Sequence, residues 1–310
     1  MLSRIAESLF WIGRYVERAE GTARILDIQT QLILEDPGSD ESHTCRTVLA
    51  IMGVPAAEDE PIRLQDLLQR LAYDPNSPTS IATCLVSARE SARRARETLS
   101  TSLWEAINTT YRPIPLGTFA QYGPARLFPW VRDRAALING TADSTMMRDE
   151  GWQFLILGRS IERADMTARL VAAASVATGD AWTTSLRACG GHEAFLRTQR
   201  GAVTDLSSAR FLLLDRQFPR SVLASLNRAE QCIANLESSG QTGVQSEAQR
   251  VLGRVRTELE YRSFTDVVID LPLEMERLQR SCADATVAIS AKYFAGSEAR
   301  LWHDGAVTSA

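Results

Sequence analysis

The chain has 310 residues, with 34 basic and 38 acidic side chains and a formal net charge of −4 at pH 7. This balance argues against a general nucleic-acid binder and against a polybasic membrane binder. Apolar residues make up 45% of the chain and charged residues 23%, as in ordinary globular proteins. Lys292 is the only lysine, which excludes lysine-dependent P-loop and kinase sites. The other basic residues are arginines, which bind carboxylates and phosphates well but transfer protons poorly.

Neither the cysteines nor the histidines show the spacing of a metal site. No C-x-x-C pair occurs among the scattered cysteines, and the histidines lie near loops or the tail (Cys45, Cys84, Cys189, Cys232, Cys282; His43, His192, His303). We therefore expect no metal and no other cofactor. The N-terminal residues lack the apolar core of a signal peptide, and no apolar run is long enough to span a bilayer. These features predict a cytoplasmic protein without a membrane segment.

The first predicted helix has an apolar side and a charged side. Leu9, Ile12, Val16, Ala19 and Ala23 recur at helical spacing and form one seam. A polar strip lies roughly opposite this seam, and it consists of Arg14, Glu17, Arg18 and Gly21, with Arg24 at its edge. The small alanines of the seam permit a close approach of another helix. The breakers at 36–39 (Asp-Pro-Gly-Ser) are expected to end this helix.

Helical periodicity continues along most of the remaining chain, and alternating strand patterns are not evident. The predicted helical segments are 80–110, 135–178, 191–214, 221–236, 245–262 and 273–294. The stretch from Arg112 to Pro129 is rich in proline and glycine, so it is predicted to be a long irregular loop. Residues 296–310 are predicted to form a flexible tail.

The polar strip belongs to a segment that occurs twice. Gly13–Arg24 aligns with Gly158–Arg169 at an offset of 145 residues, and eight of the twelve positions are identical. A second match follows at an offset of 141 residues, where segment 71–88 corresponds to segment 212–229. Two matches in the same order indicate a duplicated unit.

These patterns predict an all-α multihelical bundle made of two pseudo-symmetric repeated halves. The first half is expected to span residues 1–150 with its repeat segment at 13–24. The second is expected to span 151–295 with its segment at 158–169. Each half would then bring one copy of the charged strip to the fold.

The charged strips have two interpretations. On a solvated helix face, their ion pairs would each contribute only a few tenths of a kcal/mol. In a buried network, the strips would instead face each other near a pseudo-twofold axis. Their recurrence favours the network, in which the candidate residues are Arg14, Glu17, Arg18, Arg24, Arg159, Glu162, Arg163 and Arg169.

Charge counting adds a requirement to the network interpretation. Arg14, Glu17 and Arg18 carry a net charge of +1, and the matching residues of the second copy carry another +1. Burying such a surplus is costly without compensation. Either other carboxylates meet the strips, with Glu105, Glu258 and Glu274 as candidates, or an anionic ligand or partner does.

A further basic run lies on the segment predicted to be helical at 80–110. Arg89, Arg93, Arg94 and Arg96 can meet a phosphate or an acidic partner, or form a solvated face partly neutralised by nearby glutamates. The solvated face is the simpler interpretation. We identify no nucleophile–base arrangement and no known catalytic motif in the chain, so an enzyme is the less favoured function.

The duplicated segment, with its Glu-Arg pairs at 17–18 and 162–163, resembles the duplicated "ER" signature of the bacterial alpha-E family. Segments 88–93, 103–108, 211–215 and 219–221 also resemble that family, and the similarity extends from Met1 to about Phe294. The resemblance implies an all-helical fold. It carries no catalytic residues, because none is established in the family.

The resemblance also implies a functional setting. Alpha-E proteins are typically encoded beside, or fused to, circularly permuted ATP-grasp proteins, with transglutaminase-like peptidases nearby. This setting implies an accessory or binding component of an ATP-dependent peptide or amide ligation system. Its expected partners are a circularly permuted ATP-grasp protein and a transglutaminase-like protein. The ER residues are the expected binding surface.

Two other functions are kept as alternatives. In the first, the chain is itself an enzyme that acts on anionic peptides through Glu17 or Glu162. Arginines flank both residues and should lower their pKa values, which makes them poor general acids. In the second alternative, the chain is a structural scaffold whose ER strips only hold the two halves together.

Overall fold

The computed structural model describes residues 1–35, 40–57, 61–177, 179–199, 201, 203–237, 245–294, 300–303 and 306–309. Apart from one short hairpin, the regular structure of these residues is helical, which confirms the predicted all-α class. The helices of ten residues or more are α1 (Ser3–Glu35), α2 (Glu41–Ile51), α4 (Ile81–Arg94), α5 (Thr101–Tyr111), α6 (Pro124–Thr145), α7 (Glu150–Val176), α10 (Asp205–Leu214), α11 (Val222–Glu237), α12 (Glu247–Tyr261) and α14 (Leu271–Tyr293).

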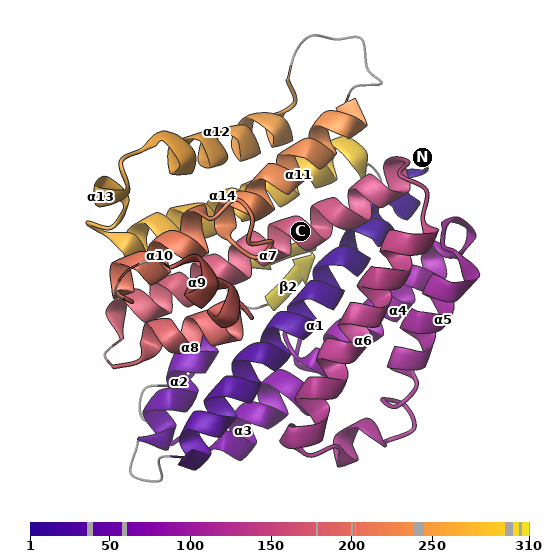
Figure 1. The fold of residues 1–310 in the computed structure, drawn as a ribbon. Coiled ribbons are helices and arrows are strands. Elements are labelled where there is room, and N and C mark those ends of the chain that lie inside the picture. The colour runs from indigo at the N-terminus through magenta and orange to yellow at the C-terminus, as the bar shows by residue number, and fades with distance from the viewer. Residues whose placement is uncertain are drawn as a thin grey trace.

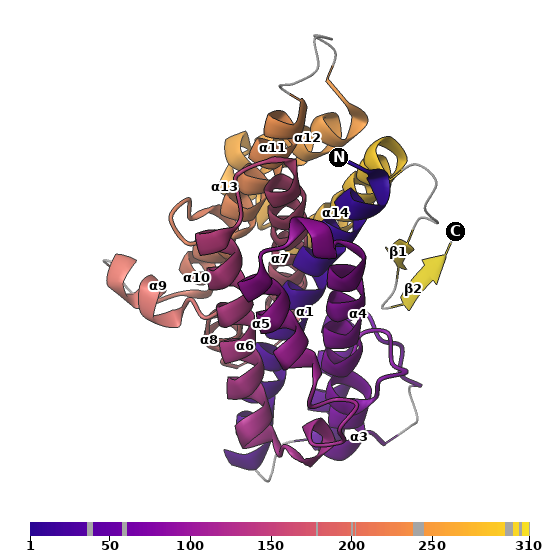
Figure 2. The ribbon, with the colours of Figure 1, turned by 90° about the vertical axis from the view of Figure 1, so that its right-hand side faces the viewer.

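Shorter elements connect these helices. They are α3 (Leu64–Leu68), α8 (Ala181–Ala188), α9 (His192–Thr198), α13 (Phe264–Val267), a π-helical turn η1 (Gln69–Tyr73), and the 3₁₀ turns η2 (Arg96–Thr98) and η3 (Phe119–Gln121). The strands β1 (Arg300–His303) and β2 (Ala306–Ser309) pair antiparallel, with Arg300 opposite Ser309. Figure 2 shows this hairpin at the outside of the helical bundle. It lies in the segment for which we predict a flexible tail.

The two longest helices, α1 and α7, form the centre of the fold and run in the same direction. Near their starts, the N-terminal amine of Met1 lies 2.9 Å from a carboxylate oxygen of Glu150. Farther along, Gly21 faces the side chain of Met166. Both helices bear the repeated ER segment, so their parallel packing places the two copies side by side. Figure 1 shows the two helices together in the middle of the bundle.

Each central helix is packed by its own set of neighbours. The helices α4 and α6 pack on α1, and α5 packs against both of them. The helices α11 and α14 pack on α7, and α12 packs against both of them. These two sets lie on opposite sides of the α1–α7 pair in Figure 1. As a result, α1 and α7 are surrounded by helices on most sides, and polar side chains on them are enclosed.

Two glycines allow the backbones of α1 and α7 to touch. A Cβ atom on Gly13 would lie 2.1 Å from the carbonyl oxygen of Leu155. A Cβ atom on Gly158 would lie 2.0 Å from the carbonyl oxygen of Phe10. Neither distance is sterically possible, so both positions require glycine. We expected the close approach at the alanines of the seam, but the repeated glycines provide it here.

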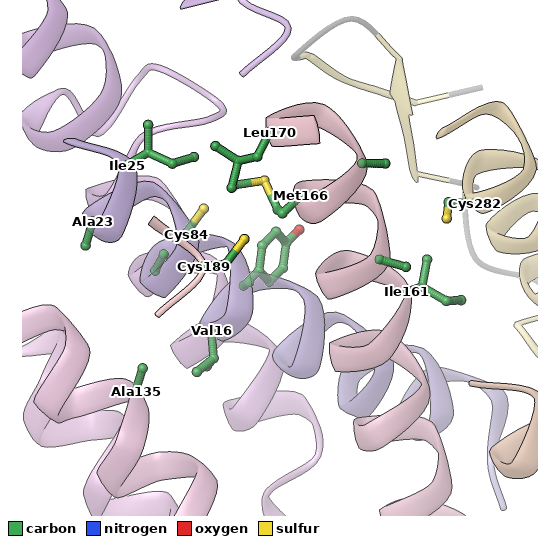
Figure 3. Close-up of a cluster of buried hydrophobic side chains, with 14 of the residues drawn as sticks. Val16, Ala23, Ile25, Cys84, Ala135, Ile161, Met166, Leu170, Cys189 and Cys282 are labelled. Atoms are coloured by element: carbon green, nitrogen blue, oxygen red, sulfur yellow. The ribbon is translucent and has the colours of Figure 1, made fainter. Parts of the chain in front are cut away.

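The cores on both sides of the central helices are apolar. Figure 3 shows part of this packing, where Val16, Ala23 and Ile25 of α1 share one buried cluster with Met166 and Leu170 of α7. Cys84, Cys189 and Cys282 also lie within it. All five cysteines are buried and unpaired, which agrees with the absence of a disulfide pattern in the sequence.

The turns before α4 and α11 have the same local structure. The hydroxyl of Ser80 donates a hydrogen bond to the carbonyl oxygen of Asp74 at 2.6 Å. The hydroxyl of Ser221 donates likewise to the carbonyl oxygen of Asp215. Each serine oxygen also accepts a backbone N–H of the first helical turn, as an N-cap residue does. These turns belong to the second sequence match, at the offset of 141 residues.

Three predicted helical segments are each divided in the structure. Segment 80–110 breaks before α5, segment 135–178 breaks before α7, and segment 191–214 breaks before α10. In each case a capping side chain starts a new helix, because Ser100, Asp149 and Thr204 accept the orphan N–H of Leu103, Trp152 and Ser207, respectively. The predicted helical segments do not include α2, α3, α8 or α13. Residues 36–39, the predicted end of the first helix, lie outside the described residues, and α1 is observed to Glu35.

The predicted long loop at 112–129 is also shorter than expected. Helix α6 begins at Pro124, where the missing N–H costs nothing because the first helical N–H groups have no partner within the helix. Pro129 lies inside the same helix. The irregular part is therefore confined to 112–123 and includes the 3₁₀ turn η3. Proline content alone overestimated this loop.

Candidate functional site

The centre of the candidate site is a pair of glutamates, one on each central helix. Glu162 of α7 accepts a hydrogen bond from Nε of Arg18 at 2.5 Å. The other oxygen of Glu162 lies 2.6 Å from Nε of Arg14. Arg14 also donates to the hydroxyl of Thr286 on α14 at 3.0 Å. Both arginines belong to α1, so the carboxylate of one ER segment is held by the guanidinium groups of the other.

Glu17 of α1 is held in turn by an arginine of α7. Nε and Nη2 of Arg163 on α7 donate to its two oxygens at 2.9 Å and 2.6 Å. This is the bidentate arrangement that gives arginine–carboxylate pairs their strength and specificity. Arg220, which precedes α11, also donates to Glu17. The pairs Arg18–Glu162 and Arg163–Glu17 therefore join corresponding positions of the two copies with the roles exchanged.

A second set of carboxylates lies one turn farther along each helix. Glu20 is 2.8 Å from Nη2 of Arg24 and 2.7 Å from Nη2 of Arg220. On α7, Asp165 accepts a hydrogen bond from Nε of Arg169 at 2.9 Å and lies 3.9 Å from Nη2 of Arg18. The outer arginines of both ER segments are thus neutralised within their own helices.

We call this set of ion pairs the ER network, and it consists of Arg14, Glu17, Arg18, Glu20, Arg24, Asp143, Arg159, Glu162, Arg163, Asp165, Arg169 and Arg220. It contains all eight candidate residues of the sequence analysis. Its inner carboxylates, Glu17 and Glu162, are 1% and 0% exposed, and Arg18 is 3% exposed. The two strips are therefore buried against each other and do not form a solvated face.

The edge of the network is more accessible than its centre. The side chains of five arginines are between 15% and 25% exposed, and these are Arg24, Arg159, Arg163, Arg169 and Arg220. An external group can reach these guanidiniums without entering the core. The network thus has an enclosed centre and a partly open rim.

The compensating carboxylates proposed from the sequence are wrong. Glu105 and Glu258 are exposed, and Glu274 pairs with Arg262 and Arg277 away from the network. Glu20 and Asp165 lie beside the strips instead, but Arg24 and Arg169 of the same segments pair with them, so the surplus of positive charge remains. These two residues occupy matching positions of the repeat, so a carboxylate recurs there in both copies. This recurrence is the sequence signal that points to them.

Arg220 was not among the candidate residues. It lies 203 residues from Glu17 in the chain, and no local pattern predicts that contact. The position that matches it in the first copy is Thr79, which is buried but carries no charge. Comparison of the two copies therefore does not reveal Arg220, because the residue occurs in only one of them.

Glu17 and Asp165 are held in the ionised state. Burial alone would raise the pKa of Glu17, but the charges of Arg163 and Arg220 outweigh burial and lower it to about 2. Burial likewise opposes ionisation of Asp165, and Arg169 and Arg18 hold its pKa below the ordinary value. The lowering predicted from the flanking arginines is therefore found for Glu17.

Two arginines of the network differ in how well they are compensated. The pKa of Arg220 is raised, because Glu17 and Glu20 outweigh the effect of its burial. The pKa of Arg159 is lowered, chiefly by burial and by the neighbouring charge of Arg163. Its ion-pair partner, Asp143, is 3.8 Å from Nη2. Arg159 is thus the arginine of the network with the least compensation.

These environments limit the chemistry of the site. A carboxylate with a strongly lowered pKa, enclosed by guanidiniums, holds no proton to donate near neutral pH. The arginines cannot act as bases, because they stay protonated. The arrangement suits the fixing of helices and the binding of anions much better than it suits proton transfer.

Two apolar cavities lie beyond the network, toward the C-terminal ends of α1 and α7. The larger, of about 540 Å³, is bordered by α1, α2, α7 and α8 and is lined mainly by apolar and small side chains. The neighbouring cavity, of about 440 Å³, shares several of these residues and also reaches Arg169. His43 lines both cavities, and the larger one also reaches Asp180 and Ser185.

Among the described residues, no helix combines the length and the apolar character needed to cross a membrane. Across the same ranges, no three side chains of histidine, cysteine, aspartate or glutamate gather closely enough to hold a metal ion.

Comparison with known proteins places these features in a family. The model of the Alpha-E family, described as a predicted alpha-helical domain with a conserved ER motif, matches residues 1–294. Uncharacterized proteins of Mycobacterium bovis and of two strains of Mycobacterium tuberculosis are 25% identical to the chain over 327 aligned positions. The alignment covers 96% of this chain but only 35% of each relative, so the chain spans about a third of their length. No solved structure is significantly similar.

Proposed function

Because the chain belongs to the Alpha-E family, we propose that it is an accessory or binding component of an ATP-grasp-linked peptide or amide ligation system. In this role it binds a circularly permuted ATP-grasp protein, or an anionic peptide that such a protein uses. The genomic setting that the family resemblance implies supports this choice of system. A transglutaminase-like protein is a further expected partner from the same setting.

The surplus positive charge of the ER network is the observation that carries the proposal. As defined above, the network contains seven arginines and five carboxylates, so its net charge is +2. A buried or half-buried surplus of this size is costly unless an anion approaches it. The partly exposed rim arginines give such an anion access. An acidic partner or a peptide carboxylate fits this requirement.

The enclosed centre of the network supports a binding role over catalysis. Glu17 and Glu162 are the residues that the enzyme alternative requires, and both are almost completely buried. Each is occupied by two arginines, so neither carboxylate is available to a substrate. The lowered pKa of Glu17 further disfavours its use as a general acid.

The scaffold alternative is favoured by a different observation, the reciprocal pairing of Arg18 with Glu162 and of Arg163 with Glu17. Buried ion pairs of this kind fix the register of two helices, because a shifted register leaves charges unpaired. We propose that the enclosed residues have this structural role while the rim arginines bind the partner. The two roles then belong to different residues of one network.

We also propose that α1–α6 and α7–α14 are two pseudo-symmetric halves of a duplicated unit. The sequence repeat, the exchanged ion pairs and the reciprocal backbone contacts at Gly13 and Gly158 support this proposal. The similar turns before α4 and α11 support it as well. In this arrangement, the ER network lies at the pseudo-twofold axis.

The test is co-purification combined with a ligation assay. The tagged chain is expected to retain an ATP-grasp protein of the same genome, and ATP-dependent ligation by that protein should increase when the chain is added. Arg169→Gln, at the rim, should weaken retention. Arg250→Gln, an exposed arginine paired with Glu247 on α12, is the matched control and should not.

The alternatives give different results in the same experiment. Turnover of a peptide by the chain alone would contradict the accessory role and support an enzyme. If no ATP-grasp protein is retained, and a rim variant lowers only the melting temperature, the result supports the scaffold alternative. Charge reversal at Arg18 is not a suitable test, because that residue is buried beside Glu162.

A further inference from the structure

Arg159 and Arg14 occupy matching positions of the two ER segments but have different surroundings. Arg14 lies 2.6 Å from Glu162 and donates to Thr286. Arg159 lies 3.8 Å from the exposed carboxylate of Asp143, and no hydrogen bond of its guanidinium is found among the described residues. Its side chain is 16% exposed. Arg159 therefore keeps donors available toward solvent that Arg14 uses within the core.

Two more arginines stand over the ring of Trp152, which lies two turns before Arg159 on α7. The guanidinium carbon of Arg148 lies 4.2 Å from the ring centroid, and that of Arg228 lies 5.5 Å from it. Arg228 is also close enough to Arg159 for its charge to lower the pKa of that group. Trp152 itself is 4% exposed, and its indole N–H has no acceptor within the described part of the chain. A buried donor of this kind ordinarily has a partner.

The first half of the chain lacks this cluster. At the offset of 145 residues, Ser3 matches Arg148 and Glu7 matches Trp152. At the offset of 141 residues, Ser87 matches Arg228. The extra positive charges thus surround only one of the two matching arginines. A feature needed merely to pack the central helices would be expected on both sides, so the difference indicates a role specific to the second half.

We infer that Arg148, Arg159 and Arg228, together with the indole N–H of Trp152, form a binding site for a doubly charged oxyanion. Among the described residues, the one ion pair of these three guanidiniums is that of Arg159 with Asp143. The charge of Glu17 also reaches Arg159, but Glu17 is already paired with Arg163 and Arg220. The cluster therefore keeps a surplus of two positive charges. Planar guanidiniums bind phosphate and carboxylate oxygens by paired N–H groups. The stacking of Arg148 and Arg228 on Trp152 holds these groups in place before the ligand arrives. The main-chain carbonyl oxygen of Asp143 further restrains Arg148, whose Nη2 donates to it at 2.7 Å.

This inference rests on the binding role proposed above and names the chemistry of the ligand. The dianion has two chemical sources, a phosphate group or a pair of carboxylates on a peptide. Both present several oxygens with a total charge near −2. Binding is expected to depend on this charge and not on the rest of the ligand molecule. Small dianions are therefore suitable probes of the site.

The test is an equilibrium titration of the purified full-length chain with inorganic phosphate and with succinate. Calorimetry measures the binding at constant ionic strength. Saturable binding is expected for at least one dianion, and acetate, a monoanion, should bind at least about tenfold more weakly. Arg159→Gln and Arg228→Gln should each weaken dianion binding about tenfold or more, as the loss of a charge-assisted hydrogen bond does. Arg93→Gln, in a dense but separate group of arginines on α4, is the control and should bind normally.

Each outcome has a definite meaning. Stronger binding of phosphate assigns a phosphate group, and stronger binding of succinate assigns a carboxylate pair. No saturable binding of either dianion, equal binding of acetate, or an equal loss in Arg93→Gln overturns the inference. The failure of the inference is distinguishable from failure of the proposed function. If the partner is retained but no dianion binds, only the inference of an anion site is wrong. If a dianion binds but no partner is retained, only the proposed ligation role is wrong.

Because Arg159 is partly buried, its variant needs an independent check of folding. Arg228 is exposed, so Arg228→Gln should unfold at the same denaturant concentration as the wild-type chain. Tryptophan fluorescence gives a second readout, since the bound dianion lies next to Trp152. A phosphate- or succinate-dependent change that disappears in Trp152→Phe places the ligand at this cluster. A change that persists in that variant overturns the assignment.

Discussion

Arg18 on α1 donates to Glu162 on α7 at 2.5 Å, in a position where neither side chain is accessible to solvent. The partners are 144 residues apart in the chain, so this contact exists only when the two central helices have docked. The pair Arg163–Glu17 repeats it with the roles exchanged. The inner carboxylate of each ER segment is therefore paired with an arginine of the other segment, and the stability of each central helix depends on the presence of its counterpart.

The first prediction concerns the loss of one inner carboxylate. Glu162→Gln leaves Arg14 and Arg18 buried beside a neutral amide, and the cost of breaking a buried ion pair in this way is about 3–5 kcal/mol. The free energy of unfolding, measured by urea denaturation, should fall by this amount.

Glu90→Gln is the control for that measurement. Glu90 pairs with Arg89 and Arg93 near the surface of α4, where an ion pair contributes at most about 1 kcal/mol. If both variants lose the same small amount of stability, the ER network does not hold the central helices together.

The sequence was sufficient to predict the all-α class and the residues that meet at the centre of the fold. The class followed from the helical periodicity. The central residues followed from the repeat, because identical charges in two copies indicate a constraint that surface positions do not have. The repeat also contains Gly13 and Gly158 at matching positions. Their role as the point of backbone contact needed the relative placement of α1 and α7.

What the sequence did not predict depends on long-range geometry or on single side chains. Arg220 reaches Glu17 and Glu20 from a turn before α11, and its matching residue Thr79 carries no charge. The helix breaks before α5 and α7 were missed because one capping residue ends a periodic pattern without changing its composition. The cluster around Trp152 was missed because its arginines come from different parts of the chain.

The second prediction concerns acid. The pKa of Glu17 is about 2 in the folded chain against an ordinary value of 4.5, so ionisation of this group favours the folded state. Its contribution is fully present above about pH 4.5 and is lost as the pH falls toward 2. A shift of this size corresponds to stability on the order of 3 kcal/mol. The free energy of unfolding should fall along this range.

Glu17→Gln provides the comparison for the acid measurement. The variant should be less stable near neutral pH, and its stability should depend less steeply on pH between about 4.5 and 2. Parallel pH profiles of the two proteins would show that Glu17 does not carry the effect. Other carboxylates, including Asp165, will still contribute to the slope in both proteins.

The third prediction concerns the five cysteines, which are all buried. Burial raises the pKa of each thiol, for example to about 12 for Cys84 and to about 11 for Cys189. Since the thiolate is the reactive form, a thiol reagent at neutral pH should label the folded chain very slowly. Five equivalents should react quickly once the chain is unfolded in guanidinium chloride. Rapid labelling of even one thiol under native conditions would show that its helix opens readily.

The last prediction tests the contact between the central helices. Gly13→Ala places a methyl group where the carbonyl oxygen of Leu155 now lies, so α1 and α7 must move apart and the ion pairs beyond that point are disturbed. Overpacking against backbone should cost about 3 kcal/mol or more. Gly140→Ala is the matched control, because its position in α6 is exposed and no atom lies within 4 Å of the added Cβ. Alanine there should stabilise the chain by about 0.5–1 kcal/mol through helix propensity. The same chemical change is therefore expected to lower the melting temperature at Gly13 and to raise it at Gly140. A Gly13→Ala chain as stable as the wild type would mean that the two helices do not touch at this point.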